Sequence, residues 1–114
     1  MKELNRAMGI KGEVLAKSFL IKKGYKILFT NYSTKLGEID IIAKHKGYVV
    51  FVEVKQRETC TFGRPSEAVD EIKQQKIRRV ATYFLKQYKL FDCDCRFDVI
   101  EIIGEEINHI ENAF

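Results

Sequence analysis

The sequence predicts a single α/β domain built on a mixed central sheet of about five strands flanked by helices. Apolar residues recur at helical spacing near the N-terminus and again in the second half of the chain. Between and after these segments lie runs rich in β-branched and aromatic residues, bounded by glycine turns. The resulting order is α-β-β-β-α-β-β. Three consecutive strands argue against a doubly wound dinucleotide-binding fold, and the sequence has no Gly-x-Gly-x-x-Gly and no P-loop.

The first predicted helix runs from about Gly9 to Lys23 and ends at Gly24. One face carries the residues that we expect to be buried: Gly12, Leu15, Ala16, Phe19 and Leu20. Strand-like sequence follows from Tyr25 to Tyr32.

Two adjacent strands, from about Leu36 to Lys44 and from about Tyr48 to Arg57, form a predicted hairpin. The turn His45-Lys46-Gly47 contains a glycine that adopts positive φ easily. A two-residue or four-residue loop centred between Lys46 and Gly47 gives one register, and a three-residue loop would break it. That register places three pairs opposite one another: Ile42 with Phe51, Asp40 with Glu53, and Glu38 with Lys55.

A polar loop from Glu58 to Arg64 precedes a second helical region, which opens at Pro65-Ser66 and ends near Tyr88. Its apolar side is predicted to consist of Val69, Ile72, Ile77, Val80, Ala81, Phe84 and Leu85. Two strands complete the sheet, Arg96 to Ile103 and Ile107 to Ile110.

Composition fits one globular domain over residues 1–114, with 46% hydrophobic and 32% charged residues. No apolar run approaches the roughly 20 residues of a membrane span, and the N-terminus lacks the apolar stretch of a signal peptide. We therefore expect a cytoplasmic protein with no membrane partner. The net charge of +4 suits a polyanionic partner. The three cysteines and two histidines do not form a four-ligand zinc pattern.

Alternation along the central hairpin separates a mixed face from an apolar face. The apolar face must pack on a helix and contains Ile39, Ile41, Ala43, Val50, Val52 and Val54. The mixed face combines apolar Ile42, Val49 and Phe51 with three carboxylates and an ammonium: Glu38, Asp40, Glu53 and Lys55. A core selected for stability would not have this composition.

Asp40 and Glu53 oppose each other on this face, with an expected Cβ separation of roughly 4.5–5.5 Å, where like charges are destabilising. Two carboxylates at that distance need a proton, a cation or a metal. Oxygen-only ligands indicate Mg²⁺ or Mn²⁺. Lys55 projects beside such an ion, where its charge can position a water or stabilise a pentavalent phosphate. The alternative interpretation is a cross-strand salt-bridge cluster.

Glu13 is a further candidate for the same site. Ala16 and Leu20 follow it on its own helical face, so we expect its side chain to point toward the sheet. Nearby Gly9 and Gly12 are consistent with a close approach of the helix backbone to the sheet or to a substrate. The alternative for Glu13 is an acid that the helix dipole stabilises.

The chain resembles the YraN-like family of small bacterial proteins over nearly its whole length. The residues that carry the resemblance are Gly12-Glu13, Gly37-Glu38-Ile39-Asp40-Ile41-Ile42, Phe51-Val52-Glu53-Val54-Lys55, Arg96-Phe97-Asp98-Val99 and Asn112-Ala113-Phe114. That family is similar to PD-(D/E)xK nucleases, close to the archaeal Holliday-junction resolvases. The resemblance thus implies a restriction-endonuclease-like fold.

The resemblance also implies roles for individual residues. Asp40 corresponds to the motif aspartate, Glu53 and Lys55 to the E-x-K pair, and Glu13 to the helix-borne acid. Ile39 replaces the proline that precedes the motif aspartate, which leaves the ligands in place. Asp40, Glu53 and the Val54 carbonyl are the expected metal ligands, with Glu13 as a further candidate.

Positive charge on the second helix suggests contacts to nucleic acid, or alternatively a solvated face. The candidate nucleic-acid-binding residues are Arg57, Lys73, Lys76 and Arg79. We expect Tyr83 and Tyr88 to be packing residues and Asp98 to be structural.

The expected function is a Mg²⁺- or Mn²⁺-dependent endonuclease acting on DNA. The alternative is a non-catalytic nucleic-acid-binding protein with a vestigial nuclease site. A homodimer, with a contact at Phe91 or Phe114, is a third possibility.

Overall fold

The structure is a computed structural model that describes residues 2–57 and 69–114, with side chains from residue 12 onward. The elements are α1 (Lys2–Lys22), β1 (Lys26–Thr34), β2 (Gly37–His45), β3 (Tyr48–Arg57), α2 (Glu71–Gln87), β4 (Asp94–Ile103) and β5 (Glu106–Ile110). The predicted α/β class and element order are confirmed. The strands form one sheet in the order β1-β2-β3-β4-β5. Among the described strands, only β3 and β4 pair in parallel, and the crossover through α2 joins them.

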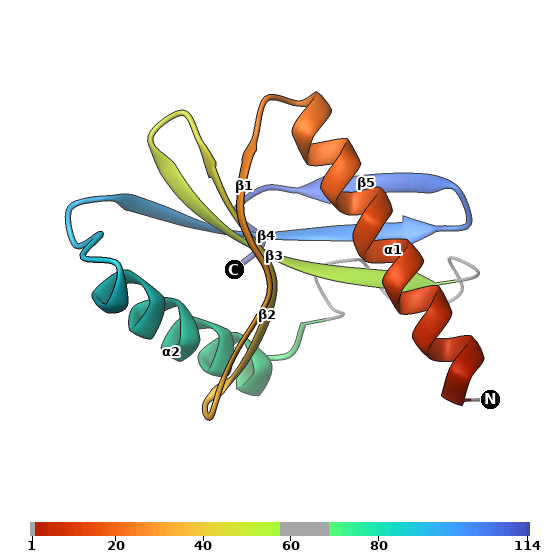
Figure 1. The fold of residues 1–114 in the computed structure, drawn as a ribbon, viewed down its shortest axis with the longest axis horizontal. Helices are drawn as coiled ribbons and strands as arrows, with labels where there is room; N and C mark the ends of the chain where they lie inside the picture. The colour runs from red at the N-terminus through yellow and green to blue at the C-terminus, as the bar shows by residue number, and fades with distance from the viewer. Residues whose placement is uncertain (1, 58–68) are drawn as a thin grey trace.

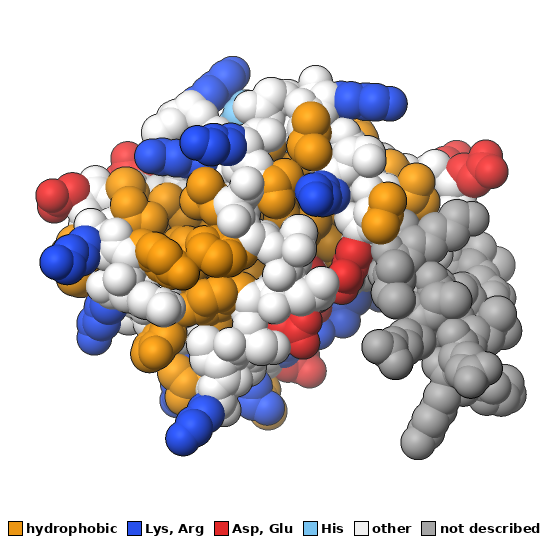
Figure 2. All heavy atoms as spheres, in the orientation of Figure 1, with side chains coloured by type: hydrophobic (Ala, Val, Ile, Leu, Met, Phe, Trp, Pro, Cys, Tyr) orange, Lys and Arg blue, Asp and Glu red, His pale blue; other side chains and the backbone are white. Residues whose placement is uncertain are grey.

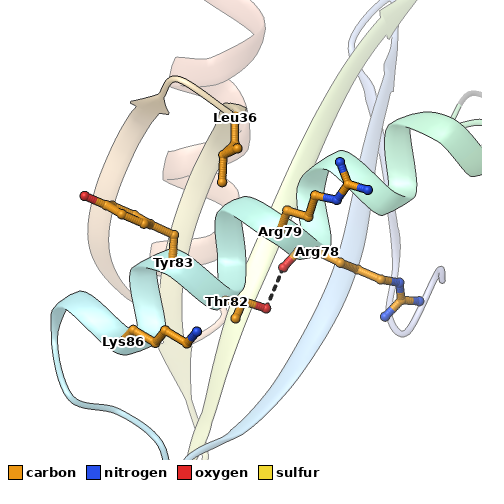
Figure 3. A pocket seen from close by; sticks show the side chains of 6 residues that line it. All are labelled: Leu36, Arg78, Arg79, Thr82, Tyr83 and Lys86. Carbon is orange, nitrogen blue, oxygen red and sulfur yellow. Dashed lines mark hydrogen bonds between the residues drawn. The ribbon is translucent and has the colours of Figure 1, made fainter.

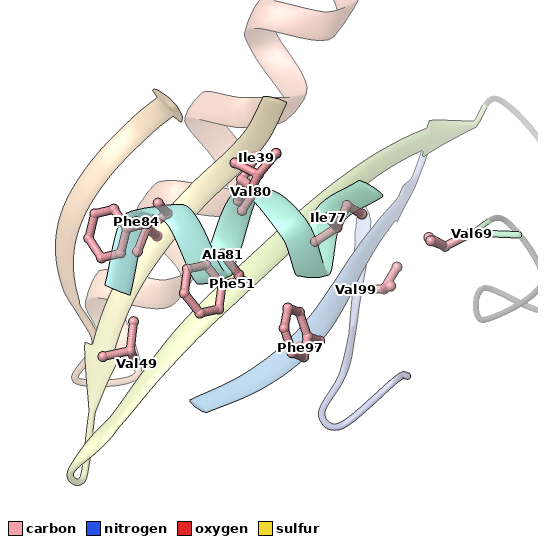
Figure 4. Packing of buried hydrophobic residues seen from close by; sticks show 11 residues of the cluster. Ile39, Val49, Phe51, Val69, Ile77, Val80, Ala81, Phe84, Phe97 and Val99 are labelled. Atoms are coloured by element: carbon pink, nitrogen blue, oxygen red, sulfur yellow. The ribbon is translucent and has the colours of Figure 1, made fainter. Parts of the chain in front are cut away.

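The two helices cover opposite faces of the sheet (Figure 1). Val50 and Val52 of β3 belong to the cluster that packs against Ala16 and Leu20 of α1. Val49 and Phe51 alternate with them and face α2 (Figure 4). The predicted apolar stripe of α1 is confirmed, and Phe84 is the largest buried side chain that α2 contributes.

The β2–β3 turn is the two-residue form, with φ of 48° at Lys46 and 86° at Gly47. Positive φ at both positions matches the right-handed twist of the flanking strands. His45 pairs with Tyr48, and Ile42 pairs with Phe51, which confirms the register predicted for this part of the hairpin. The predicted pairs Asp40–Glu53 and Glu38–Lys55 are not part of the backbone ladder. Backbone pairing ends at Ile41 and Val52, one residue before Asp40.

Ile39 lies on the opposite face of the sheet from the one predicted. Its side chain joins the α2-side cluster with Ile42 and Phe51, whereas Ile41 packs on the α1 side. Ile39 and Ile41 are two residues apart, and regular alternation would put them on the same face, but here they lie on opposite faces of the sheet. The reason is a local irregularity: β2 loses its β3 partner at this point. Asn31, the β1 residue between the partners of Ile41 and Ile39, has a left-handed φ of 53°.

The helix boundaries also differ from the prediction. α1 starts at Lys2 rather than near Gly9, since the preceding residues are mostly good helix formers and one internal glycine costs only about 1 kcal/mol. α2 starts at Glu71, with Asp70 as its N-cap. The predicted loop from Glu58 to Arg64 and the predicted opening at Pro65-Ser66 lie outside the described residues.

Ile72 is 69% exposed and does not belong to the core, contrary to the prediction. It precedes Ile77 by five positions, which is off the three- and four-residue spacing of a helical stripe. None of the described helices is long and apolar enough to cross a membrane.

Candidate active site

Asp40 is anchored to β3 by its own side chain. The Val54 backbone N–H, just beyond the last paired residues of β2 and β3, donates to Asp40 Oδ2 at 2.8 Å. A carboxylate thus takes the donor that a regular antiparallel partner would otherwise receive. The contact holds Asp40 beside the segment that carries Glu53, Val54 and Lys55.

The surroundings of Asp40 disfavour its negative charge. Burial is the largest effect and the charge of Glu53 the next, and together they raise the pKa of Asp40 to about 7. The hydrogen bond from Val54 opposes this shift, and the charges of Glu13 and Glu38 add to it. The charge of Glu53 therefore acts on Asp40, although both residues lie beyond the last backbone pair of β2 and β3.

Glu53 is only 6% exposed and lies among cations. Lys73 Nζ from α2 is 2.6 Å from Glu53 Oε1, and Lys55 Nζ is 3.8 Å from the same oxygen. The sequence placed Lys73 among nucleic-acid contacts. The structure places it on the candidate metal ligand, because the first turn of α2 lies over the end of β3.

The two lysines are affected in opposite directions. Burial, followed by the hydrogen bond and charge of Lys73, lowers the pKa of Lys55. Burial is also the largest single effect on Lys73 and disfavours its charge, but the hydrogen bonds to Glu53 and Lys55 and the charges of Glu53 and Asp40 together leave the pKa of Lys73 raised. Since Lys73 is the nearer partner of Glu53, we assign it the role of charged counter-ion and regard Lys55 as the more readily deprotonated amine.

Glu13 lies at the α1 side of this region. It lines a surface hollow together with Lys17, Thr30 and Asn31. Asn31 lies in β1 beside Asp40, between residues that pair with the neighbours of Asp40. Nothing in the sequence pattern marks Asn31 as a site residue, and only its left-handed backbone in the folded strand distinguishes it.

The oxygen atoms of Asp40 and Glu53 are suitable ligands for a hard divalent cation, but these two carboxylates alone do not complete its coordination. Two closely coupled carboxylates supply oxygen ligands and an excess of negative charge. Within the described segments, no group of three or more His, Cys, Asp or Glu side chains is close enough to hold a metal. The ion would therefore depend on Asp40, Glu53 and a backbone carbonyl such as that of Val54, with Glu13 as a further candidate.

The last four residues of β3 are half-buried, and one of them contacts a buried acid on β4. Arg57 Nε lies 3.5 Å from Oε2 of Glu101, a carboxylate that is 1% exposed and lies on β4 beside Lys55. Glu101 is not among the predicted site residues, although an acid within an otherwise apolar strand is a signal that could have identified it. Gln56 points to the opposite face, as alternation predicts, and lies directly beneath Gly12 of α1.

The exposed side of α2 carries both basic and apolar side chains. Arg79, Tyr83 and Lys86 line a hollow that Leu36 covers from the β1–β2 hairpin (Figure 3). Tyr83 is 49% exposed, so it is less of a packing residue than the sequence suggested. In Figure 2, hydrophobic side chains gather left of the centre of the face, acidic side chains lie both right of the centre and at the margins, and Lys and Arg side chains lie mostly around the margin.

Arg78 differs from its neighbours on α2. Its guanidinium lies 4.8 Å from the Phe97 ring centroid and 5.5 Å from that of Phe114, which gives it a packing role. Phe114 also stacks on Phe97, whereas Phe91 is 67% exposed.

Comparisons with known proteins agree with the resemblance seen in the motifs. The model of the family described as "Uncharacterised protein family UPF0102" matches residues 12–102. The UPF0102 protein TTE1452 of Caldanaerobacter subterraneus subsp. tengcongensis is 47% identical, with all of both chains aligned. A UPF0102 protein of Caldicellulosiruptor saccharolyticus is 48% identical over 96% of this chain and 98% of its own.

A third relative, the UPF0102 protein THEYE_A1950 of Thermodesulfovibrio yellowstonii, is 48% identical over 94% of this chain and 95% of its own. The family match includes Glu13, Asp40, Glu53 and Lys55 within its span. On this evidence the chain belongs to the UPF0102 family, which is the YraN-like family that the motifs indicated.

Proposed function

We propose that this protein is a Mg²⁺- or Mn²⁺-dependent endonuclease that hydrolyses phosphodiester bonds in DNA, in the manner of Holliday-junction resolvases. One observation carries the proposal. Burial, followed by the charge of Glu53, raises the pKa of Asp40 to about 7, and the Lys55 ammonium lies 3.8 Å from Glu53. A core gains nothing from such an arrangement, whereas a cation site does.

Asp40, Glu53 and the Val54 carbonyl would hold the cation, with Glu13 as a further candidate. When bound, the ion supplies Lewis-acid polarisation and charge neutralisation at the scissile phosphate. The Val54 N–H keeps Asp40 oriented toward β3. Burial of Glu53 limits competition from water.

Lys55 acts on the attacking water. Its ammonium would orient the water by a hydrogen bond and stabilise negative charge on the phosphate. Lys55 follows Glu53 by two residues, so both side chains project from the same face of β3 and lie near the proposed cation. Glu13 assists from α1 by a hydrogen bond to the water or by holding a second ion.

Nucleic acid would approach along α2 and the end of β3. Arg57, Lys73, Lys76 and Arg79 are the proposed contacts to backbone phosphates. Such contacts position a substrate without reading its sequence, and they weaken as salt rises. The Tyr83 hollow beside Arg79 offers an apolar surface next to these charges.

A second candidate function is a nucleic-acid-binding protein whose nuclease site is vestigial. The observation that favours it is the 2.6 Å contact between Lys73 and Glu53, which compensates the carboxylate without a metal. Binding of nucleic acid in EDTA, with no cleavage of any substrate in Mn²⁺, would support this candidate.

A homodimer would give two sites for the two strands of a branched substrate. The exposed Phe91 is a candidate contact. The mass of the protein measured by size-exclusion chromatography with light scattering tests this, and Phe91→Ser is expected to yield the monomer. A monomeric mass for the wild type would rule the dimer out.

The deciding experiment has two parts. Mn²⁺ is titrated calorimetrically into the wild type and into Asp40→Asn/Glu53→Gln, with Glu105→Gln as an exposed control. Cleavage in Mn²⁺ is then measured on four-way-junction, flap, single-stranded and linear DNA, and on single-stranded RNA. We expect binding only when both carboxylates are present. We also expect Asp40→Asn and Lys55→Ala to lose cleavage by about 100-fold or more while staying folded.

A further inference from the structure

Lys73, rather than the motif lysine, is the immediate partner of Glu53. Its Nζ lies 2.6 Å from Oε1, against 3.8 Å for Lys55. Glu53 is 6% exposed. A carboxylate this deeply buried needs a cation beside it, supplied either by the protein or by a bound ion.

Two contacts fix the position of Lys73 in the first turn of α2. Its backbone N–H donates to Asp70 Oδ1 at 2.8 Å, which makes Lys73 part of the N-cap of α2. Ile77, one turn later on the same side, is buried in the core. The side chain of Lys73 is therefore directed toward β3, where Glu53 lies.

The Lys73 ammonium is also able to move away from Glu53. Its side chain remains 40% exposed, so the ammonium can move into water while the core stays packed. Glu53, by contrast, has no such freedom, since its side chain is 7% exposed.

A divalent cation and the Lys73 ammonium compete for the same oxygen. An ion such as Mg²⁺ binds a carboxylate at roughly 2.1 Å. A second positive charge 2.6 Å from that oxygen would be repelled strongly in a partly buried site.

We propose that Lys73 is an internal counter-ion that occupies Glu53 in the metal-free protein and must vacate it when a divalent cation binds. This inference rests on the proposed metal site. It makes Lys73 a positioning residue that sets the metal affinity, in addition to any contact that it makes with nucleic acid. Lys55 keeps its place beside Glu53 throughout.

The test is calorimetric titration of Mn²⁺ alone, without nucleic acid, into the full-length protein and three variants. Lys73→Gln removes the competing charge and is expected to bind Mn²⁺ about three- to tenfold more tightly than the wild type. Lys76→Gln removes one exposed charge from the same helix and is expected to change the affinity less than about twofold. Lys73→Arg retains a cation and is expected to bind no more tightly than the wild type.

A second measurement reports the same competition through stability. Saturating Mn²⁺ should raise the Tm of Lys73→Gln by more than it raises that of the wild type or of Lys76→Gln, since tighter binding to the folded state stabilises it more. If Lys73→Gln fails to fold, Lys73→Arg carries the test, and a gain in its affinity would overturn the inference.

The outcomes separate the two proposals. Equal Mn²⁺ affinity in the wild type and Lys73→Gln would overturn the counter-ion role while leaving the metal site intact. Absence of binding in the wild type and in every Lys73 variant would overturn both. If Lys73→Gln and Lys76→Gln both bind Mn²⁺ more tightly than the wild type and to the same extent, the gain comes from the lower net charge of the protein. That result would also refute the role proposed for Lys73.

Discussion

Asp40 is a carboxyl group whose folded surroundings favour its protonated form. Its pKa rises from an ordinary 3.8 to about 7 because of burial and the charge of Glu53. A group whose folded pKa is raised stabilises the protein fully below its unfolded pKa, and this contribution is lost as pH rises through the folded pKa. The metal-free protein should therefore lose stability between about pH 4 and pH 7, by on the order of a few kcal/mol.

Urea unfolding at a series of pH values, in EDTA, measures this loss. Asp40→Asn keeps the shape of the side chain and removes the titration, so its free energy of unfolding should vary less over the same range. Parallel pH profiles for wild type and variant would show that Asp40 is not the group responsible.

Metal binding should depend on pH through the same group. A cation requires Asp40 to be ionised, so the affinity for Mn²⁺ should rise with pH up to about 7 and then level off. The charged groups facing Asp40 are Glu53 on β3, Glu13 on α1 and Glu38 on β2, while Lys55 and Lys73 interact with Glu53. Calorimetry at pH 6 in two buffers of different ionisation enthalpy should reveal proton release. Identical heats in the two buffers would contradict it.

At the scale of elements, Asp70 links the start of α2 to the candidate site. Its carboxylate caps the N–H of Lys73, whose side chain reaches Glu53. Asp70→Ala should cost about 1 kcal/mol of stability, the usual cost of losing an N-cap. Asp70→Asn keeps a capping oxygen and serves as the control. Urea unfolding at pH 8 measures both variants, and equal stability of Asp70→Ala and wild type would argue against the cap.

The contact of α1 with the sheet depends on Gly12. A Cβ at this position would lie 2.7 Å from Gln56 Oε1 and 3.3 Å from Gln56 Cδ. That oxygen is buried and, among the described groups, has no hydrogen-bond partner. Close packing here keeps Gln56 directly below the helix that carries Glu13.

A double-mutant cycle tests this packing. Gly12→Ala alone should cost about 1 kcal/mol, because the clash outweighs the higher helix propensity of alanine. In a Gln56→Ala background the same substitution should instead stabilise by about 0.5–1 kcal/mol. Additive effects in the thermal or urea unfolding of the four proteins would exclude the contact.

At the scale of the whole molecule, Asp98 ties the end of the chain to the sheet. It is fully buried, accepts two hydrogen bonds from Arg96, and lies 2.7 Å from His109 Nε2. The Asn112 backbone N–H also donates to it, at 3.1 Å. Burial would raise the pKa of Asp98, but hydrogen bonds from His109 and Arg96 outweigh it and leave the pKa lowered. The structural role that the sequence suggested for Asp98 agrees with these contacts.

Asp98→Ala should destabilise the protein by about 3–5 kcal/mol, because it leaves the buried Arg96 without its carboxylate. Asp92→Ala, at an exposed position, is the matched control and should change stability by less than about 0.5 kcal/mol. Chemical unfolding at pH 7 compares the two. A cost of 1 kcal/mol or less for Asp98→Ala would show that the network contributes little.

Local patterns in the sequence determined the elements and the identity of the candidate site. Glycine at position 47 and the alternating runs on either side specified a tight hairpin and the register of its paired residues. Just beyond these pairs, the charge of Glu53 acts on Asp40. These features depend on residues near one another in the chain, where backbone geometry leaves few alternatives. The fold class and the order of the elements followed from the same local periodicities.

Tertiary structure alone decided the features that depend on contacts between distant segments. Nothing local to Lys73 shows that its helix crosses the end of β3 and places its ammonium on Glu53. Nor does alternation show that Ile39 turns to the α2 side where strand pairing ends. Such contacts arise from how helices pack on a twisted sheet, and they depend on the whole set of side chains between the layers rather than on any one segment.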